Sequence, residues 1–223
     1  MNVAKLDGPR LAPSSGGKPR QLVILLHGYG SSGSDLIQLA PLWQQVLPDA
    51  AFVAPHAPER GLFGGRQWWA LTDFSRLGLA AGVRRASAAL DGFITAELDA
   101  SGLDESRLVL VGFSQGTMMA LHVGPCRERQ LAGIVGYSGM IADPNGLADK
   151  IRTRPPVLLV HGSADRIVPF AALKEAETEL HRLGFDVKSH AARGLGHSVD
   201  LAGIELGRDF ARKVLLAADA PPA

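Results

Sequence analysis

Residues 107–123 read RLVLVGFSQGTMMALHV and combine a strand, a turn and a helix. The segment RLVLVG is short, branched and apolar, which predicts a buried strand at Arg107–Gly112. A helical pattern follows directly at Gln115–Val123. Between the two, GFSQG fits the pattern Gly-x-Ser-x-Gly, with Ser114 at its centre. A turn this sharp predicts a strained backbone with positive φ at Ser114, and the flanking glycines leave room for it.

Apolar strands alternate with helical patterns along the rest of the chain. Strands are predicted at Gln21–His27, Ala51–Ala54, Arg107–Gly112, Gly133–Tyr137, Val157–His161 and Asp186–Ala191. Helices are predicted at Ser34–Leu47, Leu77–Leu98, Gln115–Val123, Phe170–Leu183 and Val199–Ala218. This alternation predicts an α/β fold with a mostly parallel central sheet and helices on both faces. We expect a single domain over residues 21–218, while the polar segment 1–20 either adds an edge strand or is partly disordered.

The composition argues against several classes of protein. The chain has 223 residues, enough for one α/β domain, and no apolar run reaches the roughly 18–20 residues that span a bilayer. We therefore expect no stable membrane association, and the lack of a signal-peptide pattern predicts a cytoplasmic location. A net charge of +1 without a basic stripe argues against nucleic acid as a partner. The single cysteine, Cys126, excludes an intrachain disulfide, and no Cys/His spacing indicates a metal site.

Two further side chains are placed to act with Ser114. In enzymes built on this turn, an acid and then a histidine follow the serine along the chain. Asp165 follows the strand Val157–His161, on the edge of the sheet where Ser114 is expected. His197 lies in the glycine-rich segment GLGHS, where its ring can swing between the serine and the acid. The three residues predict a nucleophile (Ser114), its base (His197) and an orienting acid (Asp165).

Each member of this trio also has a structural interpretation. The turn can carry an incidental serine, Asp165 can be a turn or helix-capping carboxylate, and His197 can be a structural histidine. The other candidates after Ser114 are less well placed. They are Asp143, Asp149 and Asp186, which lack the strand-end position, and His181 and His190, which fall within a predicted helix and strand.

The loop HGYG at residues 27–30 supplies a second functional element. In such enzymes one oxyanion donor is the amide after the serine, here Gln115, and the other comes from an early loop, here Tyr29. The same loop spells Gly-x-Gly-x-x-Gly at residues 28–33, a pattern of dinucleotide-binding turns. That pattern needs an acid about 20 residues further on, whereas the second strand ends in Ala54-Pro55-His56. We therefore expect no nucleotide cofactor.

With these residues in place, the chain resembles the phospholipase/carboxylesterase family of α/β hydrolases, which includes the acyl-protein thioesterases. The matching segments lie between Leu25 and Val199: LLHGYGSSGSDL, VGFSQGTMMAL, GYSGM, VLLVHGSADRIVP and GLGHSV. The resemblance implies an α/β-hydrolase fold, with Ser114, Asp165 and His197 as triad and the Tyr29 and Gln115 amides as oxyanion hole. It also implies hydrolysis of short- to medium-chain acyl esters without a cofactor. Thr117 stands where many relatives have Gly, and the first loop resembles bacterial carboxylesterases more than eukaryotic thioesterases.

The long segment Pro55–Thr72 is expected to lie above the sheet edge near Ser114, because loops of this length are usually functional. The predicted substrate-binding residues are Leu62, Phe63, Trp68, Trp69, Met140 and Val168, with Ile167 and Leu195 as further candidates. Alternatively, the two tryptophans only pin the loop onto the core. The segment Gly139–Pro155 is too short for a separate lid domain, so an open pocket is expected.

Together these observations predict a serine carboxylesterase that works through an acyl-enzyme on a small-molecule ester. Acyl thioesterase, lysophospholipase and peptidase activity with the same triad remain open. A non-catalytic hydrolase-fold binding module is the alternative from another class of protein. The sequence leaves a monomer and a homodimer equally open.

Overall fold

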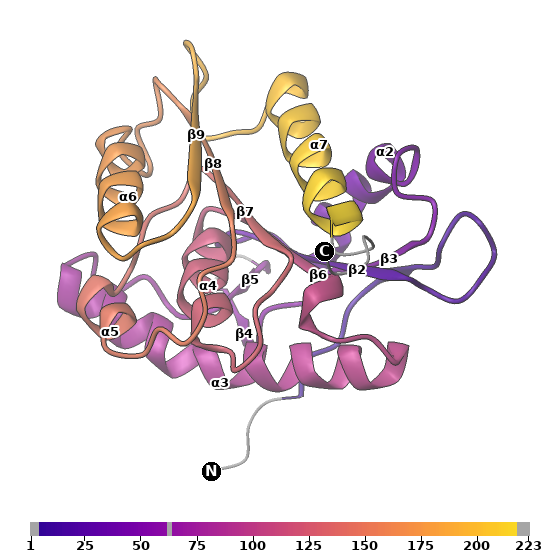
Figure 1. Cartoon of the computed structure of the whole chain (residues 1–223). Helices are drawn as coiled ribbons and strands as arrows, with labels where there is room; N and C mark the ends of the chain where they lie inside the picture. The colour runs from indigo at the N-terminus through magenta and orange to yellow at the C-terminus, as the bar shows by residue number, and fades with distance from the viewer. Residues whose placement is uncertain (1–4, 62–63, 218–223) are drawn as a thin grey trace.

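The computed structural model describes residues 5–61 and 64–217, which form a central sheet with helices on both of its faces (Figure 1). The strand order is β1-β3-β2-β6-β7-β8-β9 in a seven-stranded sheet. Every neighbouring pair is parallel except β1 and β3, which pair antiparallel. The strands are β1 (Arg10–Leu11), β2 (Gln21–Leu26), β3 (Ala50–Val53), β6 (Leu108–Phe113), β7 (Gly133–Tyr137), β8 (Val157–Gly162) and β9 (Val187–Ala192).

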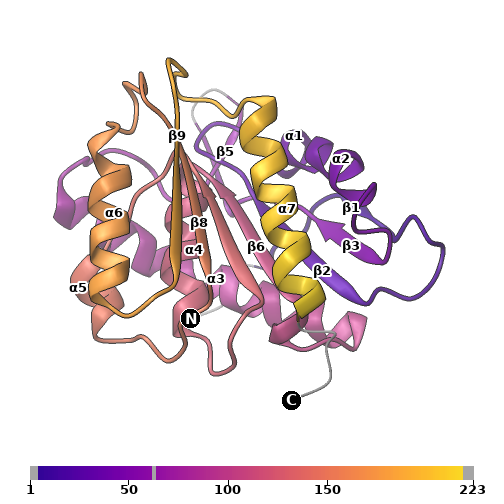
Figure 2. The same ribbon diagram turned by 45° about the horizontal axis from the view of Figure 1, so that its top comes forward.

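The helices divide between two hydrophobic layers. The helices are α1 (Gly33–Leu36), α2 (Ala40–Gln44), α3 (Arg76–Ser101), α4 (Gln115–Val123), α5 (Pro144–Ala148), α6 (Ala171–Arg182) and α7 (Leu201–Ala217). One layer contains α3, α4 and α6, and the other contains α2 and α7. Figure 2 shows α7 in front of the sheet and α3 and α4 behind it. This arrangement confirms the predicted α/β fold, and no separate lid is evident in the described part of the chain.

Strand β2 shows how the sequence produces this layering. All six of its residues are buried, and they alternate between the layers: Leu22, Ile24 and Leu26 face one, Val23 and Leu25 the other. A parallel strand covered on both faces needs such an uninterrupted apolar run. The neighbouring strand β6 is paired in register, with Leu26 opposite Gly112. The parallel strands therefore end together at one edge of the sheet.

The predicted helix Ser34–Leu47 is wrong as a single helix. The structure has α1, a 3₁₀ turn at Ile37–Leu39 and α2 in its place. Pro41 occupies the first turn of α2, where the missing backbone N–H is tolerated, so the helix begins again there. The helix also begins one residue earlier than expected, at Gly33, which packs against the chain just beyond β3: a Cβ there would lie 1.9 Å from the Ala54 carbonyl oxygen.

The long segment Pro55–Thr72 is partly regular. It contains a small antiparallel hairpin of β4 (Glu59–Arg60) and β5 (Arg66–Gln67), and a bridge joins Arg66 to Ser31. Two of the predicted substrate-binding residues, Leu62 and Phe63, lie outside the described residues. Among the helices that are described, none combines the length and the hydropathy needed to cross a bilayer.

Candidate active site

Ser114 sits in a strained turn between β6 and α4. Its backbone angles are φ 53° and ψ −115°, and its N–H donates to the Tyr137 carbonyl oxygen at 2.8 Å. A Cβ on Gly116 would lie 1.9 Å from the Leu26 carbonyl oxygen, so only glycine fits between the turn and β2. A non-glycine residue with positive φ carries a conformational cost, and such strain is concentrated at functional sites.

Asp165 and His197 are joined across the end of β8. Asp165 Oδ2 accepts from His197 Nδ1 at 2.7 Å. Asp165 Oδ1 accepts from the backbone N–H groups of Ile167 at 2.9 Å and Val168 at 3.0 Å. Burial raises the pKa of Asp165, but the hydrogen bonds from His197 and these two amides outweigh it and lower the pKa below its usual value. The carboxylate is thus held ionised with its Oδ2 facing the imidazole.

The imidazole of His197 lies against the residue that precedes Ser114. The ring centroids of Phe113 and His197 are 4.9 Å apart. The loop carrying His197 passes tightly over β8, because a Cβ on Gly162 would lie 2.3 Å from the Gly196 carbonyl oxygen. Of the residues the structure describes, Asp165 is hydrogen bonded to the ring and Ser114 is not. Catalytic hydrogen bonds are often long in ligand-free enzymes and shorten when substrate binds.

His27 fixes the peptide before Tyr29. The His27 ring is fully buried, and its Nε2 accepts the Ala57 N–H at 3.0 Å. Its Nδ1 therefore carries the hydrogen and donates to the Gly28 carbonyl oxygen at 2.7 Å. Because C=O and N–H point in opposite directions across a trans peptide, the Tyr29 N–H is directed away from His27. A Cβ on Gly28 would lie 3.2 Å from Ser114 Cβ, so this peptide passes beside the serine.

Gln115 begins α4, and its side chain is bound to the loop that carries the tryptophans. Its Oε1 accepts the Trp68 N–H and its Nε2 donates to the Trp69 carbonyl oxygen, both at 2.9 Å. Both indole side chains are only 1% exposed and belong to the layer around α3 and α4. Trp68 Nε1 also donates to the His27 carbonyl oxygen at 3.0 Å. The structure therefore anchors the tryptophans in the core, and a role for Trp68 or Trp69 as a pocket wall stays a prediction.

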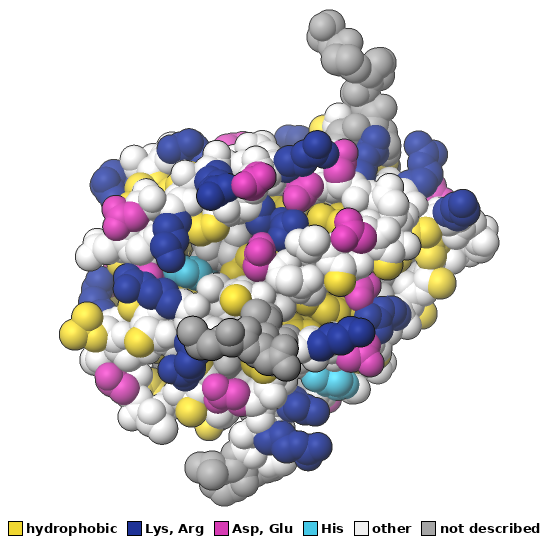
Figure 3. Space-filling view, turned by 90° about the horizontal axis from the view of Figure 1, so that it is seen from below, with side chains coloured by type: hydrophobic (Ala, Val, Ile, Leu, Met, Phe, Trp, Pro, Cys, Tyr) yellow, Lys and Arg dark blue, Asp and Glu magenta, His cyan; other side chains and the backbone are white. Residues whose placement is uncertain are grey.

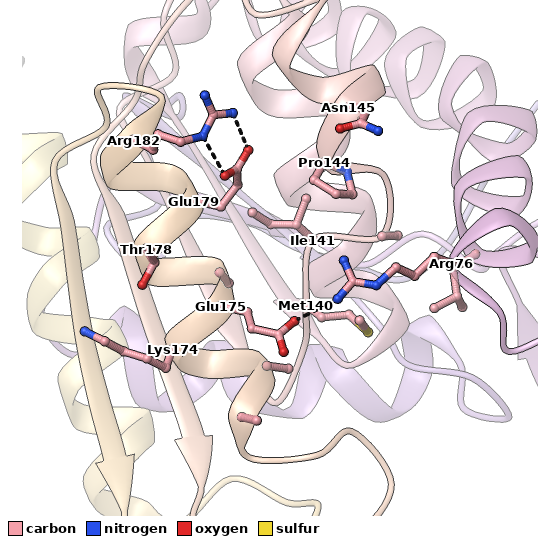
Figure 4. Close-up of a pocket in the computed structure, with 15 residues that line it drawn as sticks. Arg76, Met140, Ile141, Pro144, Asn145, Lys174, Glu175, Thr178, Glu179 and Arg182 are labelled. Carbon is pink, nitrogen blue, oxygen red and sulfur yellow. Dashed lines mark hydrogen bonds and ion pairs between the residues drawn. The ribbon is translucent and has the colours of Figure 1, made fainter.

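The other predicted substrate-binding residues lie at different depths. Met140 lines a cavity of about 700 Å³ between the start of α3, residues 140–145 and α6 (Figure 4). Val168 is buried and Ile167 is 71% exposed, while Leu195 is half-buried. Ser114, Asp165 and His197 are not part of the cavity lining. Met140 lies three residues beyond Tyr137, whose carbonyl oxygen accepts the Ser114 N–H.

Arg76 and Glu175 form an ion pair of 3.4 Å at the rim of this cavity, and both signs of charge surround it. The lower face of the molecule shows the same mixture of acidic and basic side chains (Figure 3). Within the described residues, no three His, Cys, Asp or Glu side chains are grouped as metal ligands.

Three contributors to this site were not predicted from the sequence. They are the ring of His27, the side chain of Gln115 and the ring of His161, whose Nε2 lies 3.3 Å from Asp165 Oδ2. His27 and His161 each stand directly before a glycine at the end of a buried strand. That pattern could have indicated the two histidines from the sequence, because a histidine in an otherwise apolar buried strand needs a hydrogen-bond partner.

The fold is that of an α/β hydrolase. The solved structure of esterase PE8 matches with a TM-score of 0.91 and 39% identity, over 95% of this chain and 100% of that one. The Bacillus cereus carboxylesterase shares the fold, with a TM-score of 0.77 and 19% identity over 95% of each chain.

The sequence pattern of the phospholipase/carboxylesterase family matches residues 12–215, and the chain belongs to that family. Acyl-protein thioesterase 1 of Gibberella zeae is 30% identical over 215 residues, covering 86% of this chain and 90% of that protein. Esterase YpfH of Escherichia coli is 27% identical over 197 residues, covering 86% and 82%. The protein is therefore a hydrolase of ester or thioester bonds.

Proposed function

We propose that the protein is a serine carboxylesterase that hydrolyses short- to medium-chain esters through an acyl-enzyme on Ser114. The observation that carries the proposal is the 2.7 Å bond between His197 Nδ1 and Asp165 Oδ2, beside a serine held at φ 53°. The bond leaves His197 Nε2 as the free ring nitrogen to act as base. Esterase PE8, at 39% identity, supports an ester rather than a thioester as the preferred substrate.

Each half of the reaction uses the same groups. Ser114 Oγ attacks the carbonyl carbon while His197 Nε2 accepts the hydroxyl proton, and the Tyr29 and Gln115 amides bind the oxyanion. The imidazolium then gives that proton to the departing alkoxide, which leaves the acyl group on Ser114. In the second half, His197 takes a proton from water, the hydroxide attacks the acyl-enzyme, and Ser114 recovers its proton.

We assign the cavity beside Met140 to the acyl chain of the substrate, because Met140 follows closely on Tyr137, whose carbonyl oxygen accepts the Ser114 N–H. Its floor includes the apolar side chains of Leu79, Met140 and Ile141, and its rim carries the Arg76–Glu175 pair. An apolar floor removes methylene groups from water, each worth about 0.8 kcal/mol. The charged rim stays at the surface, where a long chain would meet it.

A fluorophosphonate probe tests the nucleophile, because only an activated serine reacts with it. Wild-type protein should be labelled at Ser114, and Ser114→Ala should not. Labelling of Ser114→Ala at the wild-type rate would overturn the assignment. An unlabelled, folded wild-type protein would instead favour the non-catalytic binding module.

A series of p-nitrophenyl esters and matched acyl-coenzyme A thioesters tests the substrate class. We expect kcat/KM to be highest for ester chains of short to medium length. Met140→Trp, which narrows the cavity, should move the preferred chain to a shorter length. Faster turnover of thioesters at every length would assign the protein to the thioesterases, and a preference for lysophospholipid micelles would assign it to the lysophospholipases.

A further inference from the structure

His161 occupies a buried position at the end of β8, beside the candidate acid. Its side chain is only 2% exposed. Its Nε2 lies 2.9 Å from the Val168 carbonyl oxygen and 3.3 Å from Asp165 Oδ2. The Val168 carbonyl oxygen is an acceptor, so Nε2 carries a hydrogen and donates it there. Asp165 Oδ2 lies beside the same N–H as a longer polar contact. The edge of the ring faces Phe170, with centroids 6.2 Å apart at 72°, so the imidazole is held on a second side.

The contacts of Asp165 show what this hydrogen does. Oδ1 accepts two backbone amides, and Oδ2 faces both His197 Nδ1 and His161 Nε2. His161 is part of β8 and is also bound to Val168, whereas His197 lies in a loop. The contact with His161 therefore places Oδ2 against β8. Without His161, Oδ1 would keep its two amides, and Oδ2 would face His197 alone.

We propose that His161 is a positioning residue for hydrolysis, holding Oδ2 of Asp165 in line with His197 and closing the turn from Asp165 to Val168. The proposal rests on the proposed function, because positioning has a catalytic meaning only if Asp165 and His197 serve Ser114. A purely structural role predicts a loss of stability alone. The positioning role predicts a specific loss of kcat that a side-chain amide at the same reach restores.

The first test needs no activity and no variant. Long-range ¹H–¹⁵N correlation spectra of the wild-type protein at neutral pH report which nitrogen of each histidine carries the hydrogen. For His161 we expect the hydrogen on Nε2, and a downfield resonance from the His197–Asp165 hydrogen bond. A His161 hydrogen on Nδ1 alone would overturn the proposal, whatever the protein hydrolyses.

The second test compares His161→Phe, which fills the space without a donor, with His161→Gln, whose amide places an N–H at a similar reach. For His161→Phe we expect kcat on a p-nitrophenyl ester to fall about 10-fold to 100-fold, as expected for a misaligned catalytic group, with KM within about threefold. The acid limb of its kcat/KM profile should also change, because Asp165 Oδ2 would meet His197 without the neighbouring N–H of His161. His161→Gln should recover most of the lost kcat.

His122→Phe is the matched control, because His122 is also a buried histidine, 6% exposed, and lies eight residues beyond Ser114 in the same helix. It should keep kcat and the pH profile. A folded His161→Phe with wild-type kcat and profile, or a folded His161→Gln as slow as His161→Phe, would refute the positioning role. If His161→Phe does not fold, His161→Leu, which also lacks a donor, takes its place in the comparison with His161→Gln. A wild-type protein unreactive toward fluorophosphonate but with the expected spectra would refute only the proposed function.

Discussion

The side-chain oxygen of Gln115 accepts the backbone N–H of Trp68 at 2.9 Å, although 47 residues separate them. The other end of the same amide donates to the Trp69 carbonyl oxygen. One buried side chain thus bonds the Trp68 N–H and the Trp69 C=O of the loop. It links the loop to helix α4, which begins directly after the candidate nucleophile. The backbone N–H of the same residue is the oxyanion donor that we propose, so the loop and this proposed donor are positioned together.

Gln115→Leu should destabilise the fold by about 2–4 kcal/mol, because the Trp68 N–H and the Trp69 C=O would be buried without partners. Urea unfolding with tryptophan fluorescence measures this loss. Gln38→Leu is the matched control: Gln38 makes one long, exposed hydrogen bond to the Ser34 carbonyl oxygen, and its loss should cost less than about 0.5 kcal/mol. Equal effects of the two substitutions would contradict the role given to Gln115.

Gly116→Ala should disrupt the turn at Ser114, since the new Cβ would lie 1.9 Å from the Leu26 carbonyl oxygen and neither backbone can yield easily. We expect a loss of about 3 kcal/mol or more and a loss of fluorophosphonate labelling. Gly92→Ala should instead stabilise the fold. Gly92 is exposed within α3, and a Cβ there meets nothing within 4 Å. Because alanine favours a helix more than glycine does, the free energy of unfolding should rise by about 0.5–1 kcal/mol. A neutral Gly116→Ala in thermal melts would show that the turn has more room than its geometry indicates.

The sequence predicted best where local pattern and packing agree. Helix Gln115–Val123 and strand Gly133–Tyr137 have the bounds that their apolar patterns predict. The segment Ser34–Leu47 has an equally regular apolar pattern, yet it breaks into three parts. Pro41 lies in the first turn of the last part, and Gly33 at the start of the first part packs against the chain beyond β3, a contact that the local pattern does not contain.

In the site, too, the sequence predicted the residues with a local pattern and missed those that depend on distant contacts. Ser114, Asp165 and His197 were expected together, because parallel strands end at one edge and each residue follows a strand. The groups that hold them were not predicted. His161 and the Gln115 amide act through contacts with Val168, Trp68 and Trp69, and nothing in the periodicity of a strand or helix reports which backbone group a buried polar side chain will reach.

Asp143→Asn should reduce the dependence of stability on acid pH. The hydrogen bonds from Arg84 lower the pKa of Asp143, burial raises it, and the Gly146 amide lowers it further, for a net decrease. A carboxylate with a lowered pKa stabilises the fold above its unfolded-state pKa, and this stability is lost as pH falls through its folded-state pKa. Wild-type protein should therefore exceed Asp143→Asn in unfolding free energy at pH 7, and the difference should vanish near pH 2.

Urea unfolding at several pH values between 2 and 7 measures this difference. The amide of Asn still accepts the Gly146 N–H at the start of α5, so the substitution removes the charge and keeps the cap. Asp149→Asn, at the other end of α5, is the control and should run parallel to wild type at every pH. A gap between wild type and Asp143→Asn that persists unchanged at pH 2 would show that the ion pair with Arg84 is not its source.

Gly28→Ala should lower catalysis much more than stability. A Cβ on Gly28 would lie 3.1 Å from the Phe113 ring and 3.2 Å from Ser114 Cβ, distances at which a neighbour must shift by a few tenths of an ångström. The neighbour here is the candidate nucleophile, and His27 Nδ1 holds the Gly28 carbonyl oxygen from the other side at 2.7 Å. The shift is therefore shared between Ser114 and the peptide that presents the Tyr29 amide.

The displacement affects attack and oxyanion binding together, so kcat should fall about 100-fold, as when one oxyanion donor is removed, with KM little changed. Gly196→Ala is the matched control on the opposite side of the site: a Cβ there meets nothing within 4 Å, and kcat should stay within about threefold. Steady-state kinetics on one p-nitrophenyl ester and a thermal melt of each variant separate the two effects. Wild-type kcat in Gly28→Ala would contradict the prediction, because it would mean that the Phe113 ring and Ser114 absorb the shift without disturbing attack or oxyanion binding.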